Sequence, residues 1–296
     1  MTDMAFQNIT GLQWASLGPD ALQVLQIDNE FCTAQVALQG AQVLQFYSKQ
    51  HQRDVLWLSD RNSFVAGKAI RGGIPLCFPW FGAHAIETDY PAHGFARNMQ
   101  WQFKDAQYQQ GQGHSLTFEL RDHAATRRYW DAAFCLEMHI RLGQTLELNF
   151  RLNNLDLHPI SFGFAWHSYF AVKTQRTRLY GVEGCSYIDQ LDGHQIKQQD
   201  TAPLEFHCET DQIYPLTKGK FRLDDSSTTQ IVIETSAQSA VVWNPWIEKT
   251  KRMADLVPQS WQEFVCVEAG QVATEQQTLL PEQQLSYQLC LSLSDL

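Results

Sequence analysis

The feature that most constrains this chain is an alternation of apolar and polar residues with a period of two. In a β-strand, successive side chains point to opposite faces, so this period is typical of strands with one buried and one solvated face. Turn residues separate the alternating runs, for example at 142–144, 191–193 and 224–226. The alternation is clearest in residues 22–27, 116–120, 146–152 and 285–291. The sequence therefore predicts an all-β fold, a large antiparallel β-sandwich.

The length of 296 residues would allow two average domains, but β-sandwiches of this size also fold as one unit. Neither a low-complexity linker nor a fixed-period repeat interrupts the pattern. We therefore predict a single domain over residues 1–296. Helical patterning is confined to Thr126–Asp131 and to the segment after Trp246 that carries Lys249 to Asp255.

Charge and short motifs limit the partners of the chain. A net charge of −10 argues against nucleic-acid binding, because such binding depends on basic residues that neutralise phosphates. The sequence has neither a signal-peptide pattern nor a long apolar run, so we expect a cytoplasmic protein without membrane contact. We also expect a monomer. The seven cysteines are scattered without a CxxC, and no dinucleotide, P-loop or zincin motif occurs. We expect reduced, mostly buried cysteines, no cofactor and no metal.

Four segments break the alternation with dense Gly, Pro, Trp and His: 70–82, 91–97, 162–170 and 242–246. Functional sites are where local patterning is expected to fail. In the third segment, His167 would share one strand face with Ala165 and Tyr169, in a partly desolvated setting that shifts its pKa. A core histidine bonded to a carbonyl is the alternative interpretation. The candidate functional residues are sought in and around these segments.

Glu268 lies at the end of the apolar run 264–270, where a carboxylate is uncommon unless it has a partner. A strand-end carboxylate that reaches water is the alternative. Arg71 and Arg97 lie in glycine-containing segments that a ligand can approach, and arginine suits anionic oxygens. Further candidates for phosphate or sugar contacts are Trp80, Trp243, Lys249 and Arg252. Taken singly, each of these also fits ordinary solvated charge or aromatic packing.

Six segments, in order, resemble the glucose-6-phosphate 1-epimerases, the hexose-phosphate branch of the aldose 1-epimerase, or galactose mutarotase-like, superfamily. Individually the segments are short, but jointly they are specific and cover most of the chain. They are residues 71–75, 93–97, 165–170, 209–214, 242–246 and 267–270.

The resemblance implies a supersandwich of antiparallel strands whose concave face holds the sugar. It further implies that Glu268 is the base on the anomeric hydroxyl and His167 the acid on the ring oxygen. Arg71 and Arg97 would bind the phosphate, Asp211 would hold sugar hydroxyls, and His93 would lie beside the ring oxygen. One departure is Ala92, where some family members carry glutamine.

Anomer exchange requires a proton to leave O1 and a proton to reach O5, so that the ring opens and recloses on the other carbonyl face. One acid and one base suffice. The sequence therefore predicts an isomerase acting on a hexose 6-phosphate, most simply glucose 6-phosphate. Alternatives are a mutarotase for neutral aldoses and a non-catalytic carbohydrate-binding or sensor protein on the same fold. A glycoside hydrolase would need two placed carboxylates, and only Glu268 is a clear candidate.

Overall fold

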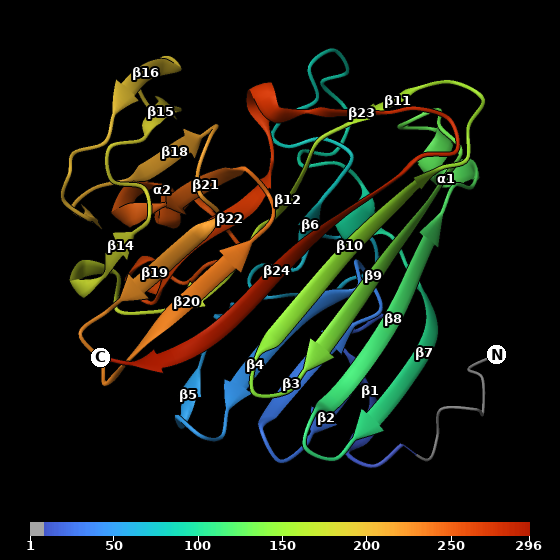
Figure 1. The fold of residues 1–296 in the computed structure, drawn as a ribbon, viewed down its shortest axis with the longest axis horizontal. Helices are drawn as coiled ribbons and strands as arrows, with labels where there is room; N and C mark the ends of the chain where they lie inside the picture. Colours follow the sequence, from blue (N-terminus) through green and yellow to red (C-terminus); the bar gives the residue numbers. More distant parts are fainter. Residues whose placement is uncertain (1–8) are drawn as a thin grey trace.

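The computed structural model describes residues 9–296, and antiparallel β-sheets make up most of it (Figure 1). Each of the four alternating runs forms a strand: β2 (Leu22–Asp28), β8 (Gly113–Arg121), β10 (Leu146–Asn154) and β24 (Gln284–Asp295). Along β10, buried and half-buried residues alternate without exception. The predicted all-β class is confirmed, and each of the three predicted turns joins two consecutive strands.

The largest sheet has nine strands in the order β17-β14-β19-β20-β24-β10-β9-β8-β7, and its long strands cross the front of Figure 1. Neighbouring strands pair antiparallel throughout. Its remaining strands are β7 (Gln102–Gln109), β9 (Phe134–Leu142), β14 (Arg178–Tyr180), β17 (Leu204–Glu205), β19 (Lys220–Asp224) and β20 (Thr229–Thr235).

A second sheet of eight strands carries Asp211, Trp243 and Glu268, and His167 lies between two of its strands. Its order is β16-β15-β18-β21-β22-β12-β6, and β13 also pairs with β22. Its strands are β6 (Leu76–Cys77), β12 (Phe164–Trp166), β13 (Tyr169–Ala171), β15 (Ser186–Asp189), β16 (Gln195–Gln198), β18 (Thr210–Tyr214), β21 (Ser239–Asn244) and β22 (Phe264–Gln271). Every residue of β22 is buried, which fits a central strand covered on both faces.

Two smaller sheets complete the β-structure. The first has the order β1-β2-β3-β4-β5 and lies behind the lower part of the nine-stranded sheet in Figure 1. The second pairs β11 with β23. Their other strands are β1 (Leu12–Leu17), β3 (Cys32–Ala37), β4 (Gln42–Ser48), β5 (Arg53–Asp54), β11 (Ile160–Phe162) and β23 (Gln277–Leu279).

The two predicted helical segments are helical over shorter or shifted ranges. The first is α1 (Ala124–Arg127), which begins earlier than predicted because His123 caps it: the Ala125 N–H donates to His123 Nδ1 over 3.1 Å. The second is α2 (Trp246–Arg252), which ends at Arg252 because Met253 is extended. Asp255 therefore lies in the loop after α2. No helix within residues 9–296 is both long enough and apolar enough to span a membrane.

The main core lies between the nine-stranded and eight-stranded sheets. Phe150 of β10 stacks on Phe164 of β12, with ring centroids 4.5 Å apart, and Phe164 contacts Trp166 at 5.1 Å. From β22, Val265, Val267 and Ala269 point into the same cluster. Because side chains alternate along a strand, the intervening residues of β12 and β22 occupy the opposite face of the eight-stranded sheet. His167 and Glu268 lie on that opposite face.

Candidate active site

The ladder between β12, β13 and β22 places His167 beside Glu268. Trp166 of β12 pairs with Ala269, and Tyr169 of β13 pairs with Cys266, so the pairing with β22 is interrupted between these two strands. His167 lies between the two strands, and its backbone N–H donates to the Pro75 carbonyl over 2.9 Å. His167 Nε2 then lies 3.3 Å from Glu268 Oε1. Two residues 101 positions apart in sequence (268 − 167) are thus in hydrogen-bonding distance.

Burial sets the protonation preferences of this pair. The side chains of His167 and Glu268 are only 7% and 1% exposed. Burial lowers the pKa of His167 well below its usual value, and electrostatic interactions with His93, Arg97 and Arg71 lower it further. Burial raises the pKa of Glu268 well above its usual value, and Asp211 adds to the rise while Arg97 and Arg71 oppose it. In the unliganded protein the neutral forms of both groups are favoured.

Each member of the pair retains an unused polar atom. Among residues 9–296, His167 Nδ1 and Glu268 Oε2 have no hydrogen-bond partner, although both atoms are buried. Buried polar groups are normally satisfied, because an unpaired one costs about 1–3 kcal/mol. These atoms are therefore available to a ligand.

Aromatic rings hold His167 in place on its sheet face. The imidazole is nearly parallel to the Tyr169 ring, with an interplanar angle of 7° and centroids 4.7 Å apart. Trp243 of β21 contacts the imidazole edge-on at 5.9 Å. Trp166, in contrast, points into the main core. This arrangement matches the predicted alternation of faces along residues 165–169.

The His93 ring also contacts His167, edge to face, with ring centroids 5.7 Å apart. Its backbone has a φ of 65°, an uncommon conformation for a residue other than glycine, and its Nδ1 accepts from the Gly82 N–H over 3.3 Å. Burial lowers the pKa of His93 to about 3, with Arg97 and Arg71 adding to the fall. His93 is therefore a neutral imidazole at physiological pH.

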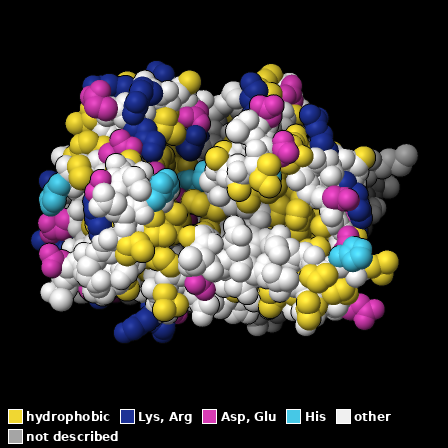
Figure 2. Space-filling model, turned by 90° about the horizontal axis from the view of Figure 1, so that it is seen from above, with side chains coloured by type: hydrophobic (Ala, Val, Ile, Leu, Met, Phe, Trp, Pro, Cys, Tyr) yellow, Lys and Arg dark blue, Asp and Glu magenta, His cyan; other side chains and the backbone are white. Residues whose placement is uncertain are grey.

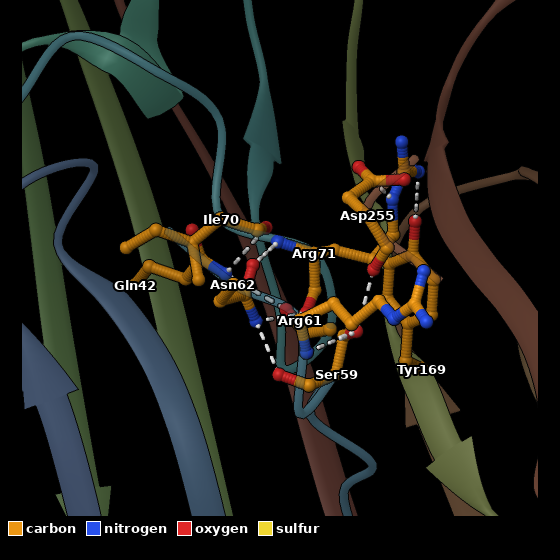
Figure 3. Close-up of polar contacts among 9 residues, drawn as sticks. Gln42, Ser59, Arg61, Asn62, Ile70, Arg71, Tyr169 and Asp255 are labelled. Carbon is orange, nitrogen blue, oxygen red and sulfur yellow. Dashed lines mark hydrogen bonds and ion pairs between the residues drawn. The ribbon is translucent and has the colours of Figure 1, made fainter. Parts of the chain in front are cut away.

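Arg71 is fixed by polar contacts from three separate segments (Figure 3). Its Nε donates to Asp255 Oδ2 over 2.9 Å, and its Nη1 donates to the Tyr169 hydroxyl over 2.8 Å. Its backbone N–H donates to Asn62 Oδ1 over 2.7 Å. Gly72, the next residue, has a φ of 108°, and a Cβ there would lie 2.5 Å from the Trp57 carbonyl oxygen. Only glycine allows the chain to pass this closely at that point.

Arg97 lies in the short 3₁₀ turn Ala96–Asn98. Its Nη2 donates to the Ala92 carbonyl over 2.8 Å, and its buried Nε has no hydrogen-bond partner among residues 9–296. The side chain of Ala92 is exposed, and Ala92 accepts from Arg97 through its backbone carbonyl.

Asp211 and Lys249 form a separate polar group beside Trp243. Lys249 Nζ lies 3.4 Å from Asp211 Oδ2 and 3.1 Å from Glu209 Oε1. It also lies 5.7 Å from the centroid of the Trp243 ring. Burial raises the pKa of Asp211, an effect that Lys249 opposes. Lys249, a candidate phosphate contact, thus has two carboxylate partners in this structure.

Two further candidates lie apart from this group. Trp80 packs in the main core, with its ring 6.1 Å from that of Phe95, and its indole N–H donates to the Pro91 carbonyl over 3.1 Å. Arg252 is exposed at the end of α2. Neither position brings the side chain to the His167–Glu268 pair.

Three residues of the site were not among the sequence candidates. Tyr169 and Cys266 each lie two positions from a candidate, His167 and Glu268 respectively, and strand alternation places them on the same faces. That two-residue spacing could have identified both residues from the sequence. Asp255 carries no sequence signal, because its role depends on the loop after α2 meeting Arg71.

Viewed from above, the molecule shows histidine side chains near the middle of the face, where the surface is hollowed (Figure 2). Basic and acidic side chains lie close by on the same face. The site therefore combines a buried acid–base pair, two guanidinium groups and aromatic walls. Such a set can bind an anionic, partly apolar ligand and move protons on it.

The chain matches a known protein family over most of its length. Residues 23–292 match the family described as aldose 1-epimerase. A protein of Escherichia coli (strain K12), named "Putative glucose-6-phosphate 1-epimerase", is 32% identical over 267 residues, which cover 89% of this chain and 87% of that protein.

Solved structures show the same architecture. The crystal structure of "a putative mutarotase" from Salmonella typhimurium has a TM-score of 0.91 at 30% identity and covers 98% of this chain and 96% of its own. A "galactose mutarotase related enzyme" from Lactobacillus acidophilus has a TM-score of 0.72 at 15% identity, covers 92% of this chain and 97% of its own, and shows the fold alone. The predicted galactose mutarotase-like sandwich is confirmed.

Proposed function

Because the chain belongs to the aldose 1-epimerase family, we propose that it interconverts the α and β anomers of a hexose 6-phosphate, with glucose 6-phosphate as the first candidate. The observation that carries the proposal is the buried His167–Glu268 contact of 3.3 Å, in which each residue keeps one unpaired polar atom. Arg71 and Arg97 supply positive charge close enough to shift the pKa of both groups. The name of the Escherichia coli relative supports the same substrate.

In the proposed mechanism, Glu268 accepts the proton of the anomeric hydroxyl while His167 delivers a proton to the ring oxygen. The ring opens to an aldehyde, the C1–C2 bond rotates, and the reverse transfers close the ring on the other carbonyl face. The pair carries one proton throughout, so the net charge of the buried site does not change. Microscopic reversibility exchanges the two roles between opening and closure.

The substrate itself would prepare the pair for this step. The positive charges of Arg71 and Arg97 lower the pKa of His167 in the free protein. A bound phosphate dianion would offset those charges and raise that pKa again, because an opposite charge favours the imidazolium form. Phosphate binding would thus promote the form of His167 that donates to the ring oxygen.

The test of the acid–base pair is the catalysed exchange rate of glucose 6-phosphate anomers in His167→Ala and Glu268→Gln. Each change should lower kcat by roughly 10²–10⁴, the usual contribution of a positioned proton donor or acceptor. Circular dichroism serves as the folding control. Near-normal rates in both folded variants would show that the assignment is wrong.

Substrate choice is tested with Arg97→Ala. Loss of the guanidinium should raise KM for glucose 6-phosphate at least tenfold and leave KM for free glucose nearly unchanged, since only the former carries the anion. An equal effect on both substrates would contradict phosphate binding and favour a mutarotase for neutral aldoses. Ligand binding without faster anomer exchange would instead favour a sensor protein.

The single domain, monomeric state and cytoplasmic location stay predictions. Size-exclusion chromatography with light scattering checks the monomeric state, for which the expected mass is that of one chain, 33.9 kDa.

A further inference from the structure

We propose that His167, Cys266 and Glu268 also form a binding site for a thiophilic divalent cation, such as Zn²⁺, whose occupancy blocks the acid–base pair. One ligand atom from each residue lies within 4.8 Å of the other two. All three residues are buried on the same face of the eight-stranded sheet. A soft sulfur, an imidazole nitrogen and a carboxylate oxygen are the ligand types that zinc prefers.

The strand pairing explains why the three side chains meet. Cys266 and Glu268 are two positions apart on β22, so both point to the same face. His167 enters from the break between β12 and β13, which pair with β22 on either side of it. Two of the three ligands thus lie on a central strand, and the third lies between two strands that both pair with it.

The distances suit a tetrahedral ion with one open position. Two ligand atoms at about 2.0–2.1 Å from Zn²⁺ lie roughly 3.3–3.4 Å apart in a tetrahedron. His167 Nε2 and Glu268 Oε1 are already 3.3 Å apart. With a Zn–S distance of about 2.3 Å, the sulfur of a tetrahedral set lies roughly 3.5–3.6 Å from the nitrogen and oxygen ligands. Because the three atoms lie within 4.8 Å of one another, the Cys266 sulfur needs a shift on the order of 1.5 Å to complete the set. Three protein ligands leave the fourth position to water.

Charge balance also permits a cation beside two arginines. Binding displaces the thiol proton of Cys266 and any proton on Glu268 to solvent, because both must ligate as anions. The loaded cluster, one divalent cation with a thiolate, a carboxylate and a neutral imidazole, is then electroneutral. Arg71 and Arg97 repel the cation but favour the two anionic ligands, so their effects largely cancel.

Substitution of Cys266 tests the metal site separately from the proposed catalysis. Its thiol takes no part in the proton transfers assigned to His167 and Glu268. It can therefore be changed without removing either of them. Cys77 provides a matched control: it is as fully buried as Cys266 and lies on β6, paired with Ala165, but it is not one of the three ligands.

The binding test uses the purified full chain in phosphate-free buffer, titrated with Zn²⁺ against a chromophoric chelator. Wild type and Cys77→Ser should each bind one equivalent of Zn²⁺. Cys266→Ser should bind Zn²⁺ at least tenfold more weakly. With Co²⁺ as the probe, wild type and Cys77→Ser should show a thiolate-to-cobalt charge-transfer band that Cys266→Ser lacks. Equal Zn²⁺ affinity in Cys266→Ser and wild type would overturn the inference.

Inhibition is the second readout, and this part rests on the proposed function. Zn²⁺ should inhibit anomer exchange by wild type and Cys77→Ser, with recovery on chelation. Inhibition of Cys266→Ser, measured relative to its own rate without metal, should require at least tenfold more Zn²⁺. Cys266→Ala replaces it if the serine variant fails to fold. If no exchange is found without metal, the proposed function fails while the Zn²⁺ and Co²⁺ titrations still decide the metal site. Equal inhibition of all three proteins would refute the blocking role.

Discussion

Tyr169 connects the two functional parts of the site. Its ring stacks on His167 with centroids 4.7 Å apart, and its hydroxyl accepts from Arg71 over 2.8 Å. Asp255, in the loop after α2, accepts from the same guanidinium, and its backbone carbonyl accepts from the Ser59 hydroxyl. A single tyrosine thus positions both a proposed catalytic imidazole and a proposed phosphate ligand.

We expect Tyr169→Phe to separate these two roles. The ring that stacks on His167 remains, whereas the acceptor for Arg71 is lost, at a cost of about 1–2 kcal/mol in arginine positioning. KM for glucose 6-phosphate should rise about five- to thirtyfold, with a smaller change in kcat. Steady-state kinetics of anomer exchange measure the split.

The control for this change is Asp255→Asn, which keeps the shape of the side chain but removes the charge paired with Arg71. It should also raise KM for glucose 6-phosphate. A fall in kcat of Tyr169→Phe at unchanged KM would contradict the positioning role and point to the hydroxyl acting on the substrate directly.

At the scale of elements, the contact between β12 and β22 fixes the separation of His167 and Glu268. Gly270 of β22 faces Ala165 of β12 in the ladder. A Cβ added to Gly270 would lie 2.2 Å from the Phe164 carbonyl oxygen and 2.8 Å from the Ala165 Cα. Both atoms are backbone, so the strands themselves would have to move apart.

Gly270→Ala should therefore lower activity more than tenfold and destabilise the protein by about 1–3 kcal/mol, as overpacking of a core does. Denaturant unfolding and anomer exchange are the two measurements. In Gly67→Ala, a Cβ meets no atom within 4 Å, so this control reports only the strain of a positive φ, about 1–2 kcal/mol. Unchanged activity in Gly270→Ala would show that β12 and β22 separate without disturbing the pair.

At the scale of the whole molecule, buried histidines make the stability depend on pH. The pKa of His93 falls from 6.5 to about 3 on folding. Below about pH 6.5 the unfolded chain binds a proton at this residue that the folded chain does not, so the free energy of unfolding decreases as the pH falls, down to about pH 3. The raised pKa of Glu268 acts in the opposite direction above its unfolded value of 4.5.

Comparison with His93→Asn isolates the histidine contribution, because asparagine tolerates the positive φ at this position. Between pH 7 and pH 5 the wild type should lose up to about 2 kcal/mol more stability than the variant. Urea unfolding at several pH values gives the difference directly. A stability difference that does not change with pH would mean that His93 titrates normally in the folded protein.

Local patterning determined much of the fold. The period of two in residues 146–152 was sufficient to predict β10, because each side chain's face follows from its position along the strand alone. The same rule predicted that His167 and Tyr169 share a face opposite Trp166. The helix limits were less accurate, since no period marks the cap His123, which begins α1, or the extended Met253, which ends α2.

Only the tertiary structure decided which residues meet. Strand alternation assigns a face but not a neighbour, and the 3.3 Å contact between His167 and Glu268 depends on β12 and β13 both pairing with β22. Lys249 is a candidate phosphate contact from the sequence, and only the fold shows that it pairs with Asp211 and Glu209. Partner choice is a long-range property, because it requires chain segments far apart in sequence to pack together, and no local pattern records that packing.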